Sequence, residues 1–590
     1  MFATSLHNKI LRWLNYILAF SGIASLISIL AVTGFYLDAS ELNFFKVIIK
    51  IIVIFYIVQE VIQLILSKNV FNYLISRWFE NILAVFLFFD LVFPDLFLNI
   101  FSNLLPHLNL LQITMIYLGI MLLGIILSVV TKALRHSEFI SKLKLNPGAV
   151  FLISFAFIII TGTLLLLLPK AVPYGKTLSF VDALFTSTSA VCVTGLTTVD
   201  TSSSFTALGK FIIMLLIQVG GLGIMTLTTF FAVFLTGGVC YKVKLMMKDL
   251  LDQDSIGAAS SLLFRITVFT LAIETVGALL LYLSLGGTFS NPNYSFIYTS
   301  VFHSVSAFCN AGFSLFKLNL MDVSTQYNYN FLAVIMSLIV LGGLGFPVLN
   351  NIATLNPFNR KSKRLRYQLT ISSKIVIITT FCLIVSGTII FFFSEPFSAN
   401  NSMGFYERYL HSVFLSITAR TAGFNSVPTE LLATSSVFIL ILLMCIGGSS
   451  GSTAGGIKTA TFSIIILTLW NLLKGKDKVE IFNRQIAEET IRKALIIVFT
   501  SISILFIGFM ILLFLEPYKN PIDLLFEATS ALGTVGLSRN LTFYLQTPSK
   551  YIIILLMFIG RIGTLTFLLS FAHLPIHYRY TLPKENVLIG

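Results

Sequence analysis

The chain has 590 residues, of which 56% are hydrophobic and only 11% are charged, and its mean hydropathy is +0.92. Soluble domains carry roughly 25% charged residues, so this composition excludes a soluble globular protein and predicts a polytopic, all-α membrane protein. The net charge of +14 does not indicate nucleic-acid binding, because no basic tract or basic–aromatic alternation accompanies it.

The N-terminal region, 1–146, contains four apolar stretches, near 10–37, 44–67, 80–104 and 110–134. Each is long enough to cross ~30 Å of hydrocarbon as a helix. The first stretch is too long for the core of a signal peptide and is followed by more apolar runs, so we expect no cleavable signal. A basic, helix-breaking link from Arg135 to Pro147 closes the region. The sequence therefore predicts four extra transmembrane helices at the N-terminus.

A three-part unit then recurs four times: a long apolar span, a half-length amphipathic stretch and a second apolar span. The first spans lie near 148–168, 261–284, 372–394 and 492–515, and the second spans near 209–236, 331–353, 436–472 and 549–572. The stretch between the two spans is too short to cross, so the chain must enter and leave the membrane on one side. Such backbone is tolerated only where it is buried in protein or lines a watery cavity. We predict four helix–pore loop–helix repeats around a pseudo-fourfold pore, at 147–240, 241–356, 357–475 and 476–580, with a tail at 581–590.

Positive charges gather in three loops, whereas loops such as 285–297 and 395–406 carry almost none. By the positive-inside rule, the basic loops are predicted to be cytoplasmic and the half-length stretches to open from the outer side. The basic residues are Lys242, Lys244 and Lys248, then Arg360, Lys361, Lys363, Arg364 and Arg366, then Lys474, Lys476, Lys478, Arg484, Arg492 and Lys493.

Each half-length stretch ends in a glycine-centred segment: CVTGL (192–196), CNAGF (309–313), RTAGF (420–424) and GTVGL (533–537). The central glycines recur about every 110–120 residues, which predicts one structural unit copied four times. A potassium ion must lose its water in a narrow pore, and backbone carbonyls can replace that water. Glycine adopts at low cost the dihedral angles that turn carbonyls inward. We therefore predict a selectivity filter that binds potassium through the backbone carbonyls of Cys192, Val193, Thr194, Gly195, Cys309, Asn310, Ala311, Gly312, Arg420, Thr421, Ala422, Gly423, Gly533, Thr534, Val535 and Gly536.

The second spans carry a further register of small residues: GGLG at 220–223 and 342–345, GGSSG at 447–451 and GRIG at 560–563. Close helix packing explains the first two copies. In the third copy, residues 446–459 (IGGSSGSTAGGIKT) contain too many glycines and hydroxyl residues for an ordinary membrane helix. We predict that this segment breaks into a flexible loop that lines a cavity below the filter. The loop contains Gly447, Gly448, Gly451, Gly455, Gly456 and Lys458.

Arg561 stands in the fourth copy where the other copies have Gly221, Gly343 and Gly448. An arginine deep in a span costs at least ~2.5–3.5 kcal/mol unless it faces water or a partner. Two readings follow: a buried ion pair, or a cation placed under the filter to restrain conduction. Lys458 at the end of the loop could instead extend to the cytoplasmic face.

These motifs resemble those of the ion-conducting membrane subunit of the bacterial Trk/Ktr potassium uptake systems (TrkH/KtrB), relatives of plant HKT and fungal Trk transporters. The resemblance covers about 148–575. It implies four repeats in one chain that imitate a tetrameric potassium channel, an intramembrane gating loop, and an arginine at the narrow point, here Arg561. Serine in place of the first filter glycine is associated with sodium permeability in the family, so Gly195 favours potassium; Arg420 also fits the family pattern.

The same resemblance implies a homodimer in the cell (inner) membrane and a cytoplasmic nucleotide-binding regulatory subunit (TrkA/KtrA-like). The basic loops 354–370 and 473–493 are candidate docking surfaces for it. The family has zero or two leading helices, so the four predicted in 1–146 are a departure.

No catalytic constellation appears in the sequence. There is no phosphate-binding loop, zinc-ligand cluster or nucleophile–base pair, and the five cysteines are scattered, so we expect neither an enzyme nor a cofactor in this chain. A sodium- or proton-coupled potassium symporter, or a less selective sodium/potassium transporter, remains an alternative. Four repeats of one orientation argue against an alternating-access carrier built from inverted repeats.

Overall fold

The computed structural model describes residues 22–65, 70–71, 74, 78–93, 147–235, 257–286, 294–354, 369–394, 404–476 and 478–571. Within these ranges the regular structure is helical apart from one antiparallel hairpin, β1 (Glu480–Ile481) and β2 (Arg484–Gln485). The predicted span 110–134, the basic loops at 242–248 and 360–366, and the tail 581–590 lie outside the described residues.

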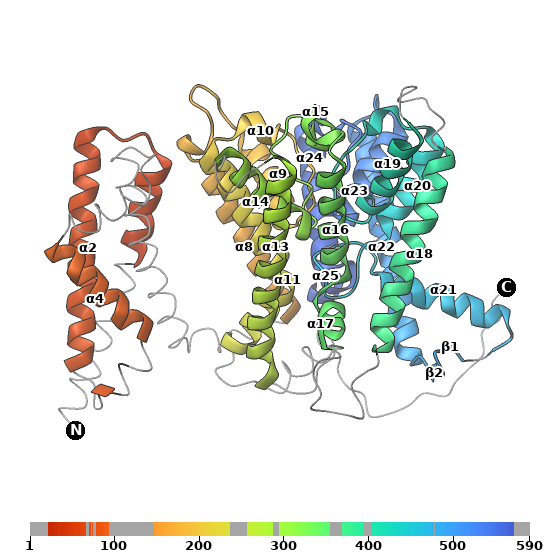
Figure 1. Ribbon diagram of the computed structural model, residues 1–590, viewed down its shortest axis with the longest axis horizontal. Coiled ribbons are helices and arrows are strands. Elements are labelled where there is room, and N and C mark those ends of the chain that lie inside the picture. Colours follow the sequence, from red (N-terminus) through yellow and green to blue (C-terminus); the bar gives the residue numbers. More distant parts are fainter. Residues whose placement is uncertain are drawn as a thin grey trace.

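Three N-terminal helices, Gly22–Gly34, α2 (Ala39–Ile65) and α4 (Trp78–Val92), form a small bundle at one end of the molecule (Figure 1). Their shared core includes Val32, Tyr56 and Leu87. The bundle meets the rest of the chain around the segment that follows α8 (Pro147–Leu166). Lys170 Nζ donates to Val32 O at 3.2 Å, and the rings of Tyr36 and Tyr174 pack edge to face with centroids 5.8 Å apart.

Removing residues 1–140 is expected to leave ion transport intact, because the described contacts of this bundle lie at the edge of the main body rather than near its centre. Flux into liposomes containing residues 141–590 checks this expectation. Loss of folding in the shortened chain would show instead that the N-terminal bundle is a structural part of the protein.

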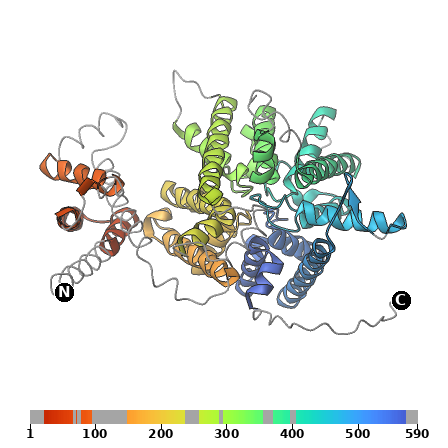
Figure 2. The ribbon, with the colours of Figure 1, turned by 90° about the horizontal axis from the view of Figure 1, so that it is seen from below.

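The main body consists of four groups of helices arranged around a common centre (Figure 2). Each group has a long first helix, a short helix and a second helix. The long first helices are α8, α13 (Gly257–Ser284), α18 (Ile371–Ser394) and α22 (Glu488–Leu515). The short helices are α9 (Phe180–Val191), α14 (Tyr294–Phe308), α19 (Phe405–Thr418) and α23 (Pro521–Gly533).

The second helices are interrupted in three of the four groups. In the first group, α11 (Ala207–Leu235) is continuous. In the other groups the second helix is a pair: α16 (Tyr329–Leu344) with α17 (Phe346–Thr354), α20 (Thr434–Cys445) with α21 (Thr459–Leu473), and α24 (Thr547–Ile562) with α25 (Thr564–Phe571). The apolar spans predicted near 331–353 and 549–572 thus each consist of two helices. The break between α16 and α17 bends the chain by 97° at Gly345, and α24 ends at Gly563, both glycines having positive φ. Only glycine adopts that conformation without strain.

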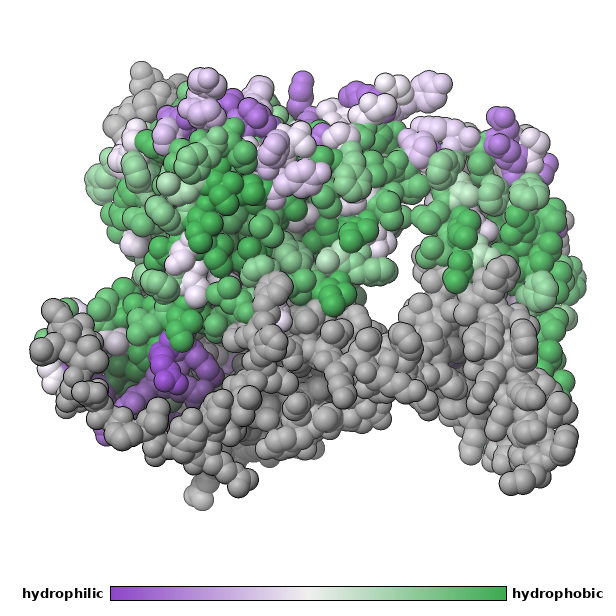
Figure 3. Space-filling view, turned by 180° about the vertical axis from the view of Figure 1, so that it is seen from behind, coloured by the Kyte–Doolittle hydropathy of each residue, from purple (hydrophilic) through white to green (hydrophobic). Residues whose placement is uncertain are grey.

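On the face shown in Figure 3, the described part of the main body is largely hydrophobic, with a polar rim at the end where the short helices begin. Large side chains such as Phe381, Phe499 and Phe506 are exposed at 60–74% on the first helices. Exposed aromatic and aliphatic side chains on this scale are favourable in lipid and costly in water. By length and composition, α2, α13, α18 and α22 contain candidate membrane spans, and the bent pair α16–α17 qualifies together.

Close approaches of backbone hold the helices of a group together. A glycine of the second helix touches a carbonyl of the short helix in three groups: Gly220 with Val191 O, Gly342 with Phe308 O, and Gly560 with Leu532 O. A Cβ on any of these glycines would collide with that carbonyl. Each carbonyl belongs to the residue four positions before the motif glycine of its group. The first two GGLG copies are thus explained by packing of the second helix on the short helix. In the third group the equivalent Gly447 lies against Gly455 O instead, because the loop replaces the helix there.

Candidate ion-conducting site

The four glycine segments share one backbone conformation. Each motif glycine has positive φ: 99° at Gly195, 69° at Gly312, 74° at Gly423 and 92° at Gly536. The residue two positions earlier is also left-handed in every segment, at Val193, Asn310, Thr421 and Thr534. Non-glycine residues seldom adopt positive φ. The recurrence of positive φ at these equivalent positions means that the four segments share one uncommon backbone conformation.

The four segments close into a ring. A Cβ on Gly195 would lie 2.5 Å from Ala311 O, one on Gly312 2.9 Å from Ala422 O, and one on Gly423 2.5 Å from Val535 O. A Cβ on Gly536 would collide with Thr194 O, which returns the chain of contacts to the first segment. Each glycine therefore lies beside the carbonyl that precedes the next glycine. A side chain at any of the four would collide with its neighbour in the ring.

Several polar atoms of this ring lack partners. Among the described residues no donor bonds to the carbonyl oxygens of Thr194, Ala311, Ala422 and Val535. The hydroxyls of Thr194, Thr421 and Thr534 are also buried without a hydrogen bond within the described chain. Buried polar groups are normally satisfied, so oxygen atoms gathered in this way fit a site for a cation that has lost its water.

Hydroxyl groups on the short helices support the ring from outside. Ser189 Oγ accepts from Gly195 N and Ser530 Oγ accepts from Gly536 N, both at 3.0 Å. Ser306 Oγ donates to Phe313 O at 2.8 Å, and Thr418 Oγ1 donates to Phe424 O at 2.7 Å. Our sequence reasoning missed these residues, although a Ser or Thr five or six positions before each glycine was a visible signal.

Three short helices also carry an ionisable side chain that contacts a serine just past the motif glycine. His303 Nε2 lies 3.0 Å from Ser314 Oγ, and His411 Nδ1 lies 3.1 Å from Ser426 Oγ. In the fourth group Glu527 accepts from Ser538 Oγ at 2.5 Å. These contacts anchor the chain that leaves each segment, so the ring is supported on both sides of its glycines.

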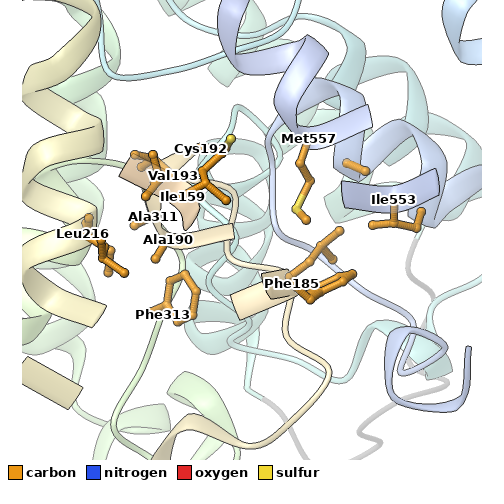
Figure 4. Close-up of a cluster of buried hydrophobic side chains, with 14 of the residues drawn as sticks. Ile159, Phe185, Ala190, Cys192, Val193, Leu216, Ala311, Phe313, Ile553 and Met557 are labelled. Atoms are coloured by element: carbon orange, nitrogen blue, oxygen red, sulfur yellow. The ribbon is translucent and has the colours of Figure 1, made fainter. Parts of the chain in front are cut away.

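Several side chains of the predicted filter residues pack into the protein around the ring. Cys192, Val193 and Ala311 belong to a buried cluster that also includes Phe185 and Phe313 (Figure 4). At the first position of the other segments, Cys309 Sγ lies 3.8 Å from Glu274 Oε1, and Arg420 Nη1 donates to Thr380 O on α18 at 3.3 Å. Hence Arg420 supports the ring from behind.

The predicted loop 446–459 is a compact turn whose ends are joined. Gly447 N donates to Ile457 O at 2.9 Å, and Ile457 N donates to Cys445 O at 3.1 Å. Its tip reaches the second group, where Ser449 N donates to Gly343 O at 3.0 Å and Phe346 N donates to Gly451 O at 3.2 Å.

The inner part of the loop lies against two filter segments. Gly447 faces the methyl group of Thr421, and a Cβ on Gly455 would collide with the side chain of Thr534. Gly448 packs beside Gly343 O, and Gly451 and Gly456 adopt positive φ. Thus Gly447 and Gly455 lie beside the filter segments, whereas Gly448 and Gly451 contact the second group.

Arg561 connects this loop to the first group. Its side chain is 2% exposed, Nη2 donates to Gly220 O at 2.6 Å, and Nη1 donates to Thr453 O. Both described partners of its guanidinium are backbone carbonyls, and no carboxylate of the described chain pairs with it. Lys458 Nζ donates to Ala454 O at 2.6 Å, so its ammonium folds back onto the loop rather than extending to the cytoplasmic face.

Comparison with known proteins identifies relatives of the chain. The sequence pattern of the family described as "TrkH: Cation transport protein" matches residues 116–577. The chain is 35% identical over 458 residues to the potassium/sodium uptake protein NtpJ of Enterococcus hirae, covering 76% of this chain and 98% of that protein. It is 38% identical over 447 residues to the Ktr system potassium uptake protein B of Bacillus subtilis, covering 74% and 96%.

A solved structure has the same fold. The potassium transporter TrkH from Vibrio parahaemolyticus superposes with a TM-score of 0.59 at 15% identity, over 77% of this chain and 91% of that one. The helices and these matches define a multi-pass membrane cation transporter, not an enzyme. The chain belongs to the TrkH family of the Trk/Ktr cation transport proteins.

Proposed function

We propose that the chain takes up potassium through a filter formed by the four glycine segments, with potassium as its substrate. The closed ring of backbone carbonyls without described donors is the observation that carries this proposal. Such carbonyls replace the hydration shell of a cation without a fixed charge that would trap it. The names of the relatives in Bacillus subtilis and Enterococcus hirae, which state uptake of potassium or of potassium and sodium, support the choice of ion.

The four groups of helices are, in this proposal, repeats around a pseudo-fourfold axis, at 147–240, 241–356, 357–475 and 476–580. The recurrence of left-handed residues at equivalent positions supports it. So does the glycine–carbonyl contact between second and short helices, which recurs in the first, second and fourth groups.

Conduction is gated by loop 446–459 together with Arg561. Supporting this, the loop lies against Thr421 and Thr534 of the filter, and Arg561 binds both the loop and the first group. A cation at this place opposes the passage of another cation. Loop and arginine must separate, or the loop must move aside, before an ion can pass.

Replacing Arg561 with glutamine is expected to raise potassium flux by about tenfold. Removing one charge from the wall of a pore lowers the barrier for a cation by about 1–2 kcal/mol at an effective dielectric constant of about 20. Flux into proteoliposomes measures the effect. Arg484→Gln, in the exposed hairpin, is the matched control and is expected to leave flux unchanged. Reduced flux in folded Arg561→Gln protein would contradict a restraining role.

Family membership supports a proposal about partners. We infer a homodimer in the lipid bilayer of the cell membrane, no bound cofactor in this chain, and a cytoplasmic nucleotide-binding regulatory subunit. The hairpin β1–β2 and the exposed lysines before it, Lys474, Lys476 and Lys478, offer a basic surface for that subunit.

A channel and an ion-coupled symporter make different predictions for one experiment. Potassium flux into proteoliposomes is measured across imposed voltages, with and without a sodium or proton gradient. A channel follows the potassium electrochemical gradient alone. Flux driven uphill by sodium or protons would instead establish coupled transport, and absence of potassium flux under any gradient would overturn the proposed function.

A further inference from the structure

A cavity lies behind the gating loop, between the third and fourth groups of helices. It has a volume of about 1450 Å³, its open mouth included. One wall is the loop from Ser450 to Lys458; the opposite walls are α22, the end of α23 and the junction of α24 with α25. None of the four motif glycines of the ring lines it, although Gly533 at the start of the fourth glycine segment does.

Two cations and several hydroxyl groups line the inner end. Lys458 and Arg561 both contribute, and no Asp or Glu occurs among the described residues that line the cavity. Arg561 is 98% buried, and its Nε has no partner in the described chain. Ser501 Oγ and Thr564 Oγ1, 3.0 Å apart, add hydroxyl groups nearby. Two cations without a counter-charge in a membrane favour an anion.

The outer part of the cavity is apolar. Ile497, Ile502 and Leu505 of α22 line it, together with Leu565 of α25. Ile502 is 57% exposed, so the cavity reaches the lipid-facing surface of α22. A cationic inner end and an apolar mouth toward the bilayer together fit an anionic amphiphile rather than a free ion.

We propose that this cavity binds an anionic phospholipid, with its phosphate near Lys458 and its acyl chains along α22. Such a lipid contacts the loop from Ser450 to Lys458 and restrains its movement. This consequence for gating rests on the proposed function, whereas the binding itself does not.

Native mass spectrometry of the full-length protein tests the proposal. The purified protein is equilibrated with equal amounts of phosphatidylglycerol and phosphatidylcholine, and retained lipids are counted. We expect preferential retention of phosphatidylglycerol, and a fall of about fivefold in Lys458→Gln, which removes one cationic contact. Lys478→Gln, an exposed lysine outside the cavity, is the control for non-specific attraction.

A second pair of variants keeps the test independent of the loop. Ile502→Trp blocks the mouth of the cavity and is expected to abolish lipid retention. Ile507→Trp is the control and is expected to leave retention unchanged. Ile507 has almost the same exposure (58%) on the same helix, but it does not line the cavity. Equal retention of both lipids, or retention unaffected by Lys458→Gln and Ile502→Trp, would overturn the proposal. The proposal would also be overturned if the protein retained added inorganic phosphate instead of lipid and Ile502→Trp did not change that retention. None of these outcomes depends on ion flux, so they are distinguishable from a failure of the proposed filter.

Discussion

Replacing Gly195 with serine is expected to weaken the preference for potassium over sodium by about tenfold, a change of about 1.4 kcal/mol in the difference between the two ions. Gly195 has φ +99°, and a Cβ would lie 2.5 Å from Ala311 O in the next segment. The serine must therefore displace a carbonyl of the ring, and its hydroxyl adds an oxygen that a smaller ion can use. Reversal potentials with potassium and sodium on opposite sides measure the preference.

The matched control is Gly175→Ser. Gly175 also has positive φ, +84°, but a Cβ there has open space around it. Both substitutions carry similar backbone strain, and only one alters the ring. Permeability ratios that are unchanged in folded Gly195→Ser protein, or changed equally in both variants, would contradict the assignment of this segment to the filter.

Deleting residues 450–456 is expected to raise potassium flux by at least tenfold. The ends of the loop are already joined by the hydrogen bonds of Gly447 and Ile457, so the deletion shortens the loop without separating α20 from α21. It also removes Thr453, one of the two described acceptors of Arg561. The measurement is flux into proteoliposomes at equal amounts of monodisperse protein.

Combining this deletion with Arg561→Gln tests whether the two act together. Residues that act through one contact are non-additive, so the double variant is expected to conduct little more than the deletion alone. Unaltered or reduced flux after the deletion, in protein that remains folded, would show that the loop is not a barrier.

The sequence predicted the parts of the site that depend on local pattern. The half-length stretch predicted before the first glycine segment is the helix α9, Phe180–Val191, and the four motif glycines all have positive φ. Hydrophobicity located the first helices to within a few residues for α18 and α22, because span length is set by the bilayer.

What the sequence did not predict depends on contacts between groups. The bend at Gly345 coincides with the hydrogen bond from Phe346 N to Gly451 O, a partner about a hundred residues away. Likewise, the carbonyl partners of Arg561 come from the first and third groups, and no periodicity in its own helix indicates them. The supporting hydroxyls such as Ser189 were visible in sequence, but polar residues in a short amphipathic helix are equally consistent with simple solvation.

The most direct test of the central claim is to locate the ion. Rubidium replaces potassium in crystals of the full-length protein, and anomalous difference maps reveal its position. We predict a peak at the centre of the ring, coordinated by the carbonyl oxygens of Thr194, Ala311, Ala422 and Val535. Well-ordered rubidium elsewhere in the transmembrane region, with an empty ring, would contradict the claim that these four segments form the filter.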